Sequence, residues 1–291
     1  MSVIVGLMNI LSIQSHVACG HVGNSAAVFP LQRLGVEVWP IHTVQFSNHT
    51  GYGDWQGRVF DADLIRELVG GIEKRGVLGE CDGVLSGYVG GADIGVAILD
   101  AVATAKRANP AVHYCCDPVI GDVGRGVFVA RDIPEFMRSK AVPAADIVTP
   151  NQFELDFISG RESKTLAQAR DAVKALHDLG PRAILVTSLH THETPEDAID
   201  LLASDETGCF RLRTPRLPLI VNGAGDTMAA LFFAHYIRTG KIDEALSRAG
   251  SAIFGVLAKT AEMGAREIQL VTAQEQIVSP SRTFEAEKIS A

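Results

Sequence analysis

Long apolar runs are absent from the sequence. No run reaches the roughly 20 residues that a membrane-spanning helix needs, so no membrane partner is expected. The longest candidate, residues 3–11, contains Gly6 and Asn9 and has no basic residues before it. This run predicts a first strand and not a signal peptide, so a cytoplasmic protein is expected.

Paired cysteine motifs are also absent. The five cysteines are an odd number, and no C-x-x-C pair occurs, so reduced thiols are expected in place of a disulfide framework. Two clusters mix residue types that ligate metals: His16, Cys19 and His21, and His190, His192 and Glu193. Neither cluster repeats the paired spacing of a structural zinc site, and we predict no zinc at either.

Basic residues are fewer than acidic ones. The chain has 26 lysines and arginines against 34 aspartates and glutamates, a formal net charge of −8. Sequence-independent nucleic-acid binding needs clustered basic residues that neutralise phosphates, so nucleic acid is not an expected partner. Linkers, low-complexity stretches and internal repeats are missing too, which predicts a single domain over residues 1–291.

Short apolar runs alternate with segments of helical periodicity, which indicates parallel strands joined by crossover helices. Strands are expected at residues 3–13, 36–41, 83–85, 113–116, 146–148 and 183–186. Helices are expected at residues 24–34, after Asp61, and at 94–108, 132–138, 166–179, 227–238 and 243–260. Strands 198–202 and 209–212 have no helix between them, so antiparallel members are expected there. The predicted fold class is α/β with a mostly parallel central sheet.

Two common nucleotide-binding motifs are missing. No G-x-x-x-x-G-K-[ST] sequence occurs, which excludes a Walker loop. The G-x-G at Gly223 and Gly225 has no third glycine after it, because Met228 stands where the dinucleotide-binding pattern needs one. An NAD-dependent dehydrogenase is therefore not expected.

A glycine turn, Asn222-Gly223-Ala224-Gly225-Asp226-Thr227, comes directly before an expected helix. Glycines let the backbone approach an anion, and free N–H groups with the helix dipole favour negative charge. Asp226 beside such a site fits a base that takes a proton from a hydroxyl attacking a γ-phosphorus. The alternative is that Asp226 only stabilises the first turn of its helix.

Further carboxylates follow two other strands. In Thr149-Pro150-Asn151-Gln152-Phe153-Glu154, Asn151 and Glu154 have the spacing of a capping box, and Glu154 also suits a hydrated Mg²⁺. Asp117 and Asp122 lie five residues apart at the start of a glycine-rich loop. Such carboxylates can hold cations that offset triphosphate charge, and the loop could close over reactants. A solvated turn is the alternative.

Small hydroxyl and aromatic residues gather in three short stretches: Ser15-His16, Phe46-Ser47-Asn48-His49-Thr50-Gly51-Tyr52 and Gly87-Tyr88. These residue types suit a flat, neutral heteroaromatic ligand, because ring faces stack and a few polar groups fix its orientation. Isolated aromatic residues are more often part of a core.

Together these motifs resemble the ribokinase-like superfamily and, within it, the pyridoxal kinases. The pyridoxal kinase pattern is carried by residues 13–17, 20–24, 43–52, 85–88 and 117–119, whereas residues 149–154 and 223–226 are shared across the superfamily. Residues 47–52 are the most specific block. The resemblance implies a three-layer sandwich, with helices on both faces of the sheet, and a homodimer.

The resemblance also implies residue roles. It makes Asp226 the catalytic base and the amides of Gly223, Ala224 and Gly225 an anion hole. The pyridine ring would contact Ser15, Val22, Phe46, Thr50, Gly51, Tyr88, Phe128 and Asp226. ATP would contact Asp117, Thr149, Asn151, Glu154, Thr187, Ser188, Ala224 and Gly225, with Thr214, Pro215, Arg216 and Leu217 bordering adenine. Mg²⁺ and a monovalent cation, expected to be K⁺, would lie among Asp117, Asp122, Thr149 and Glu154.

The resemblance therefore implies ATP-dependent phosphorylation of the 5′-hydroxymethyl group of pyridoxal, the salvage reaction EC 2.7.1.35. Pyridoxine and pyridoxamine remain possible substrates, and the Thr-Ser pair at 187–188 agrees with one of two branches. One alternative is a hydroxymethylpyrimidine kinase, although those enzymes usually carry cysteine in place of Asp226. Another alternative is a non-catalytic carrier of vitamer or nucleotide. The presence of a suitable residue at every expected catalytic position argues against it.

Overall fold

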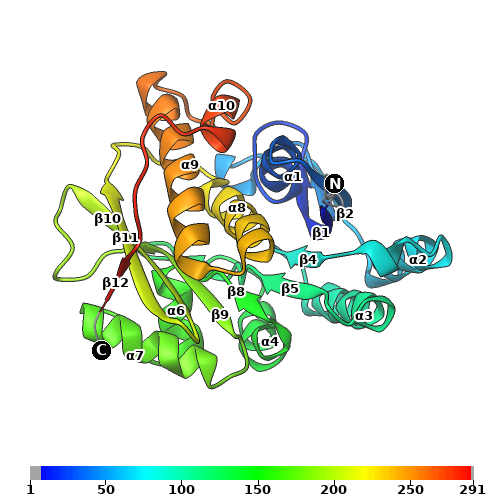
Figure 1. Cartoon of the computed structure of the whole chain (residues 1–291). Coiled ribbons are helices and arrows are strands. Elements are labelled where there is room, and N and C mark those ends of the chain that lie inside the picture. Colours follow the sequence, from blue (N-terminus) through cyan, green and yellow to red (C-terminus); the bar gives the residue numbers. More distant parts are fainter. Residues whose placement is uncertain (1–7, 290–291) are drawn as a thin grey trace, which may run out of the picture.

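A computed structural model describes residues 8–289 of the chain (Figure 1). Its main sheet has the strand order β12-β11-β10-β9-β8-β5-β4-β1-β2-β3. The strands, in chain order, are β1 (Met8–Val17), β2 (Val36–Phe46), β3 (Gly57–Val59), β4 (Gly83–Ser86), β5 (His113–Cys116), β8 (Ile147–Val148), β9 (Ala183–Leu189), β10 (Ala198–Asp205), β11 (Gly208–Pro215) and β12 (Glu287–Lys288). A separate small hairpin pairs β6 (Gly121–Asp122) with β7 (Gly126–Val127).

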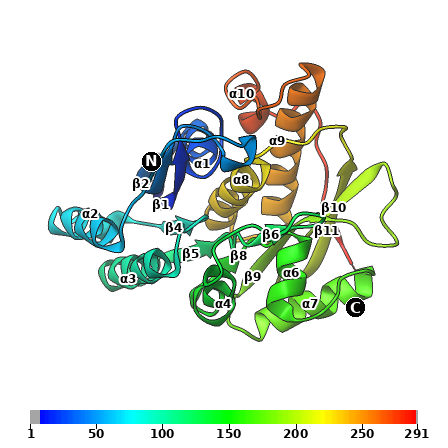
Figure 2. The same ribbon diagram turned by 180° about the vertical axis from the view of Figure 1, so that it is seen from behind.

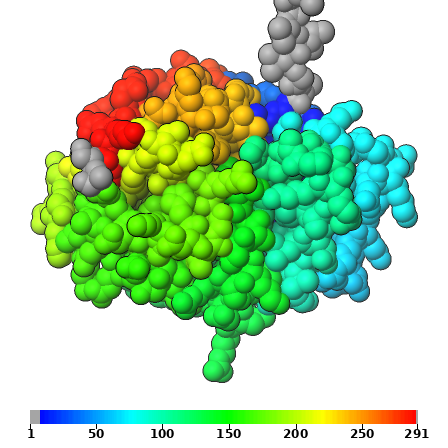
Figure 3. Space-filling model, turned by 60° about the horizontal axis from the view of Figure 1, so that its bottom comes forward, coloured from blue at the N-terminus to red at the C-terminus, as the bar shows by residue number. Residues whose placement is uncertain are grey.

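Helices cover both faces of the main sheet (Figures 1 and 2). One face carries α1 (Asn24–Arg33), α8 (Ala224–Thr239), α9 (Ile242–Glu262) and α10 (Gln274–Val278). The other carries α2 (Ala62–Lys74), α3 (Ala92–Ala108), α4 (Ile133–Phe136), α5 (Val142–Ala144), α6 (Gln152–Ser159) and α7 (Leu166–His177). In the space-filling view, the orange atoms of α9 lie toward the top of the molecule, and green segments cover its lower front (Figure 3). The expected three-layer sandwich is confirmed.

Each face of the sheet has its own apolar core. Consecutive residues of a strand point to opposite faces, so Ile10 packs into the core under α8 while Leu11 packs into the core under α3. Both are fully buried. A parallel sheet covered on both faces needs apolar residues at successive positions, which explains the short continuous apolar runs.

The sheet is parallel through its centre and antiparallel at its ends. Strands β2, β1, β4, β5, β8 and β9 pair in parallel. Strands β10 and β11 form an antiparallel hairpin, as expected from the missing helix between them. Strand β10 also pairs antiparallel with β9, and β3 pairs antiparallel with β2.

Several expected boundaries were wrong. The predicted start of the first strand, residues 3–7, lies outside the described residues, and β1 continues to Val17. Strand β2 runs on to Phe46, because Val44 and Phe46 pack with Val17 in a small third core. The helix expected at 132–138 is divided into α4, a π-helical turn (Met137–Ala141) and α5. Helix α8 begins at Ala224, so Asp226 lies in its first turn.

The predicted cap at Asp61 is confirmed. The Asp61 side chain caps α2 by accepting a 2.8 Å hydrogen bond from the Leu64 N–H. All five cysteines are free. Within residues 8–289, no helix combines the length and apolar character needed to cross a bilayer.

Candidate active site

A cavity of about 400 Å³ opens at the carboxyl ends of the parallel strands, in front of the start of α8. It brings together most residues singled out from the sequence: Ser15, Val22, Phe46, Thr50, Gly51, Tyr88, Asp117, Asp122, Phe128, Thr149, Asn151, Glu154, Thr187, Ser188, Gly223, Ala224, Gly225 and Asp226. The expected adenine border, Thr214 to Leu217, does not line it. That segment lies at the end of β11 and just beyond.

The glycine turn before α8 has a shape that only glycine fits. Gly223 has φ of 85°, and a β-carbon there would stand 1.9 Å from the carbonyl oxygen of His21. The Thr227 hydroxyl donates a 3.1 Å hydrogen bond to the carbonyl of Ala26, which fixes the start of α8 against α1. The first N–H groups of a helix have no partner within the helix. The turn therefore offers the cavity a fixed set of donors for an anion.

Asp226 stands in this first turn and lines the cavity. Burial raises the pKa of its carboxyl, while the backbone amides of Gly23 and of Asp226 itself act in the opposite direction. A carboxylate is a better proton acceptor when its pKa approaches the working pH. The geometry is therefore suited to general-base chemistry.

Asp117 and Thr149 follow directly after β5 and β8, two neighbouring parallel strands. The Thr149 hydroxyl donates a 3.0 Å hydrogen bond to Oδ1 of Asp117, and both residues are buried. Burial raises the pKa of Asp117 well above its usual value, and the charges of Glu154 and Asp226 raise it further. This carboxyl is thus held without a compensating positive charge.

Glu154 connects α6 to the loop that follows β5. The capping box with Asn151 is present: Asn151 Oδ1 accepts from the Glu154 N–H, and Glu154 Oε2 accepts from the Asn151 N–H at 2.9 Å. Oε1 also accepts a 2.8 Å hydrogen bond from the Ile120 N–H. Burial raises the pKa of Glu154 to about 7 even though these backbone hydrogen bonds lower it. The structural role expected of Glu154 is confirmed, and it places the carboxyl in the cavity wall.

The donor set of the cavity fits a cation. No ion pair within residues 8–289 involves Asp117, Asp122, Glu154 or Asp226. Buried charges are costly unless they are paired or bind metals. Carboxylate and hydroxyl oxygens such as those of Asp117 and Thr149 are hard donors, which Mg²⁺ prefers. No three His, Cys, Asp or Glu side chains of the described chain form a metal-binding group, so a cation here would need further oxygens.

The opposite side of the cavity is apolar and aromatic. Val22 and Tyr88 pack on the third core of Val17, Val44 and Phe46, and the Phe46 ring lies 4.2 Å from that of Trp55, centroid to centroid. The hydroxyl-bearing Ser15 and Thr50 line the same cavity. This wall suits a flat ring with few polar contacts.

Sequence reasoning gave no role to His49, Arg125 or Asn222, which also line the cavity. His49 Nδ1 accepts a 3.1 Å hydrogen bond from the Gly51 N–H. Burial lowers the pKa of His49, and the positive charge of Arg125 lowers it further. His49 and Arg125 lie within stretches singled out from the sequence. Neither could be given a role there, because its neighbours in the cavity become known only from the fold.

The three-layer fold, with a glycine turn facing a carboxylate-lined cavity, defines a kinase of the ribokinase-like class. The phosphomethylpyrimidine kinase family of this class matches residues 82–271. Pyridoxal kinase PdxY of Granulibacter bethesdensis is 56% identical over 284 residues, which cover 96% of this chain and 99% of that protein. PdxY of Rubrobacter xylanophilus is 54% identical over 286 residues, covering 98% and 99%. The chain belongs to the pyridoxal kinase family.

A solved structure agrees over the full length. The pyridoxal kinase of Leishmania donovani in complex with ADP and pyridoxamine has a TM-score of 0.89 at 30% identity, covering 97% of this chain and 99% of that one. The resemblance drawn from the motifs is confirmed.

Proposed function

We propose that this chain transfers the γ-phosphoryl group of ATP to the 5′-hydroxymethyl group of pyridoxal, giving pyridoxal 5′-phosphate and ADP. The observation that carries the proposal is that one cavity joins an aromatic wall to a helix start bearing Asp226. The relatives are named pyridoxal kinases, and the Leishmania donovani kinase was solved with ADP and pyridoxamine.

In the proposed mechanism the 5′-oxygen attacks the γ-phosphorus, and the bond from phosphorus to the β,γ-bridging oxygen breaks. Asp226 accepts the hydroxyl proton as the new bond forms. Backbone N–H groups at residues 223–225 donate to the phosphoryl oxygens, where negative charge is greatest in the transition state. Phosphoryl transfer depends mainly on positioning and electrostatics, so few side chains take part in bond changes.

Cations complete the site in this proposal. Asp122 would hold Mg²⁺, and Asp117, Thr149 and Glu154 would surround a monovalent cation, expected to be K⁺. When bound, these ions supply positive charge that offsets the triphosphate. These side chains would hold the ions close to the glycine turn, since the carboxyl groups and the turn line one cavity.

Nucleotide binding is proposed at Thr187 and Ser188 on β9, with residues 214–217 beside the adenine. Ser188 has φ of 52°, an uncommon backbone conformation for a residue other than glycine. Its position in the cavity wall supports a functional reason for this conformation. Residues 214–217 are proposed from the resemblance.

Phosphorylation of hydroxymethylpyrimidine is the second candidate function, because the family that matches residues 82–271 is named after phosphomethylpyrimidine kinase. Two features favour pyridoxal: aspartate at position 226, and the aromatic and hydroxyl residues of 46–52 in the cavity wall. A carrier without activity would have no need for the base and the anion site together.

A coupled assay of ADP release tests the proposal, with pyridoxal, pyridoxine, pyridoxamine and hydroxymethylpyrimidine compared with and without K⁺. We expect K⁺-stimulated turnover with pyridoxal and much slower turnover with the pyrimidine. Faster turnover of the pyrimidine would replace the proposal with the second candidate, and no ADP from any alcohol would favour a carrier. The homodimer and the single domain over residues 1–291 stay predictions.

A further inference from the structure

Arg125 is the one lysine or arginine that lines the active-site cavity within residues 8–289. The same wall carries four carboxyl groups, those of Asp117, Asp122, Glu154 and Asp226. ATP would bring several more negative charges into this space. A single guanidinium among so many negative groups has a strong electrostatic reason to meet the phosphates.

The guanidinium group is unpaired despite these acidic neighbours. Its central carbon lies 5.5 Å from the ring centroid of Phe128, a cation–π contact. One terminal nitrogen lies 3.5 Å from where a β-carbon of Gly51 would stand. Within the described chain it makes no side-chain hydrogen bond and no ion pair, and the residue is exposed. An exposed cation–π contact is weak, so a ligand can replace it at little cost.

Arg125 stands at the turn of the β6–β7 hairpin. The base of the hairpin is tied to the nucleotide side of the cavity, because Asn151 Nδ2 donates a 2.8 Å hydrogen bond to the Gly121 carbonyl. Figure 2 shows β6 beside α6. The tip leans toward the aromatic side, where Phe128 and Gly51 lie. The guanidinium therefore lies in the cavity wall near Gly51 and Phe128, on a hairpin whose base is tied to Asn151 on the proposed nucleotide side.

The turn itself leaves room for this side chain. Gly124 and Gly126 flank Arg125 with φ of 81° and 66°, and a β-carbon at either would meet no atom within 4 Å. The Arg125 N–H donates to the Asp122 carbonyl at 3.2 Å, which closes the turn. The arginine side chain is thus carried on a short turn with open space around it.

We propose that the Arg125 guanidinium binds oxygens of the phosphoryl group as it passes from ATP to the vitamer, an inference that rests on the proposed function. A planar guanidinium can donate two parallel hydrogen bonds to a phosphoryl group, which a lysine cannot do. Such a donor acts where charge is greatest in the transition state, and it also holds the phosphate of the product.

The test compares Arg125→Ala, Arg125→Lys and a matched control, Arg131→Ala, which removes a nearby exposed arginine that does not line the cavity. We expect kcat/KM for ATP to fall about 10- to 100-fold in R125A, the range for loss of a hydrogen bond to a charged group. Binding of pyridoxal 5′-phosphate should weaken by a similar factor, whereas binding of pyridoxal alone changes less than about twofold. R125K should recover part of the loss, and all variants should keep the wild-type Tm.

Two results would overturn the inference. R125A could match R131A in kcat/KM and in product affinity, or it could weaken pyridoxal as much as pyridoxal 5′-phosphate. The second result would place Arg125 at the ring of the vitamer. Failure of the proposed function is distinguishable, because it would appear as wild-type protein that releases no ADP with pyridoxal.

Discussion

The Thr149 hydroxyl donates a 3.0 Å hydrogen bond to Oδ1 of Asp117 where β8 and β5 end side by side. The partner of this buried carboxyl is neutral, so ionised Asp117 would have no compensating positive charge, and burial raises its pKa well above the usual value. Protons and metal cations should therefore compete for the group formed by Asp117 and Glu154.

Potassium should stabilise the protein more at high pH than at low pH. The folded state holds the Glu154 proton more tightly than the unfolded state, because burial raises its pKa from 4.5 to about 7. Without the cation, the stabilisation that comes from the tightly held Glu154 proton is fully present below about pH 4.5. It is lost as the pH rises toward 7. A bound cation favours the ionised carboxyls and offsets the loss, so the K⁺-induced rise in Tm should grow between about pH 6 and about pH 8.

Thermal unfolding in equal concentrations of potassium chloride and tetramethylammonium chloride measures this effect. Asp117→Asn is the control and should remove most of the difference between the salts. An equal Tm in both salts at the higher pH would show that these carboxyls bind no small cation.

Gly223→Ala should destabilise the protein. The substitution forces a side chain into a left-handed conformation and against the His21 carbonyl. We expect a loss of about 1–3 kcal/mol in the free energy of unfolding, with a displaced anion site and lower kcat. Denaturant unfolding gives the value.

Gly225→Ala is the matched control for stability, because a β-carbon there meets no atom within 4 Å. In the helix this change should leave stability equal or raise it by up to about 1 kcal/mol. Equal losses in the two variants would mean that the turn at Gly223 is not conformationally restricted.

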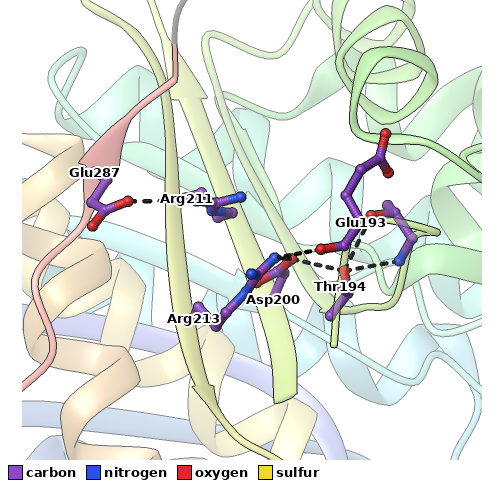
Figure 4. Close-up of polar contacts among 7 residues, drawn as sticks. Glu193, Thr194, Asp200, Arg211, Arg213 and Glu287 are labelled. Carbon is purple, nitrogen blue, oxygen red and sulfur yellow. Dashed lines mark hydrogen bonds and ion pairs between the residues drawn. The ribbon is translucent and has the colours of Figure 1, made fainter. Parts of the chain in front are cut away.

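Asp200 and Arg213 form a two-pronged ion pair between β10 and β11 (Figure 4). Both contacts are 2.7 Å, and the Thr194 hydroxyl donates a further 2.8 Å hydrogen bond to Asp200. Asp200 is only 1% exposed. Arg213→Ala leaves this carboxylate buried and unpaired, so we expect a loss of about 3 kcal/mol on urea unfolding.

Arg211→Ala is the matched control, because it removes an arginine of the same strand whose acidic partner is exposed. Its contact with the exposed Glu287 is 3.5 Å long and should contribute less than about 1 kcal/mol. A similar loss of unfolding free energy in Arg213→Ala and Arg211→Ala would show that the burial of Asp200 does not determine how much its ion pair contributes to stability.

Local patterns in the sequence predicted the elements that depend on local chemistry. The Asn151–Glu154 spacing predicted the capping box of α6, and the alternation of apolar runs with helical segments predicted the mostly parallel sheet with crossover helices. The glycine turn and Asp226 could be singled out as candidates because they are adjacent in the chain, at the start of α8.

Features that depend on distant neighbours could not be predicted in this way. Strands β6, β7 and β12 contain two residues each, too few for any periodicity, and exist only through their pairing partners. The extension of β2 to Phe46 follows from packing against Val17 on β1. The surroundings of Arg125 could not be predicted, because the carboxyl groups that line the cavity with it come from three separate segments.

The proposed mechanism depends on Asp226 as the base, and kcat of Asp226→Asn with pyridoxal and saturating ATP tests this role most directly. Asparagine keeps the shape of the side chain and an oxygen that accepts from a backbone amide, but it cannot take up the hydroxyl proton. The measurement needs a circular-dichroism melt showing that the variant stays folded.

We predict that kcat falls about 10²- to 10⁴-fold in the folded variant, the usual loss when a general base is removed. A folded Asp226→Asn enzyme that turns over pyridoxal at close to the wild-type kcat would contradict the account.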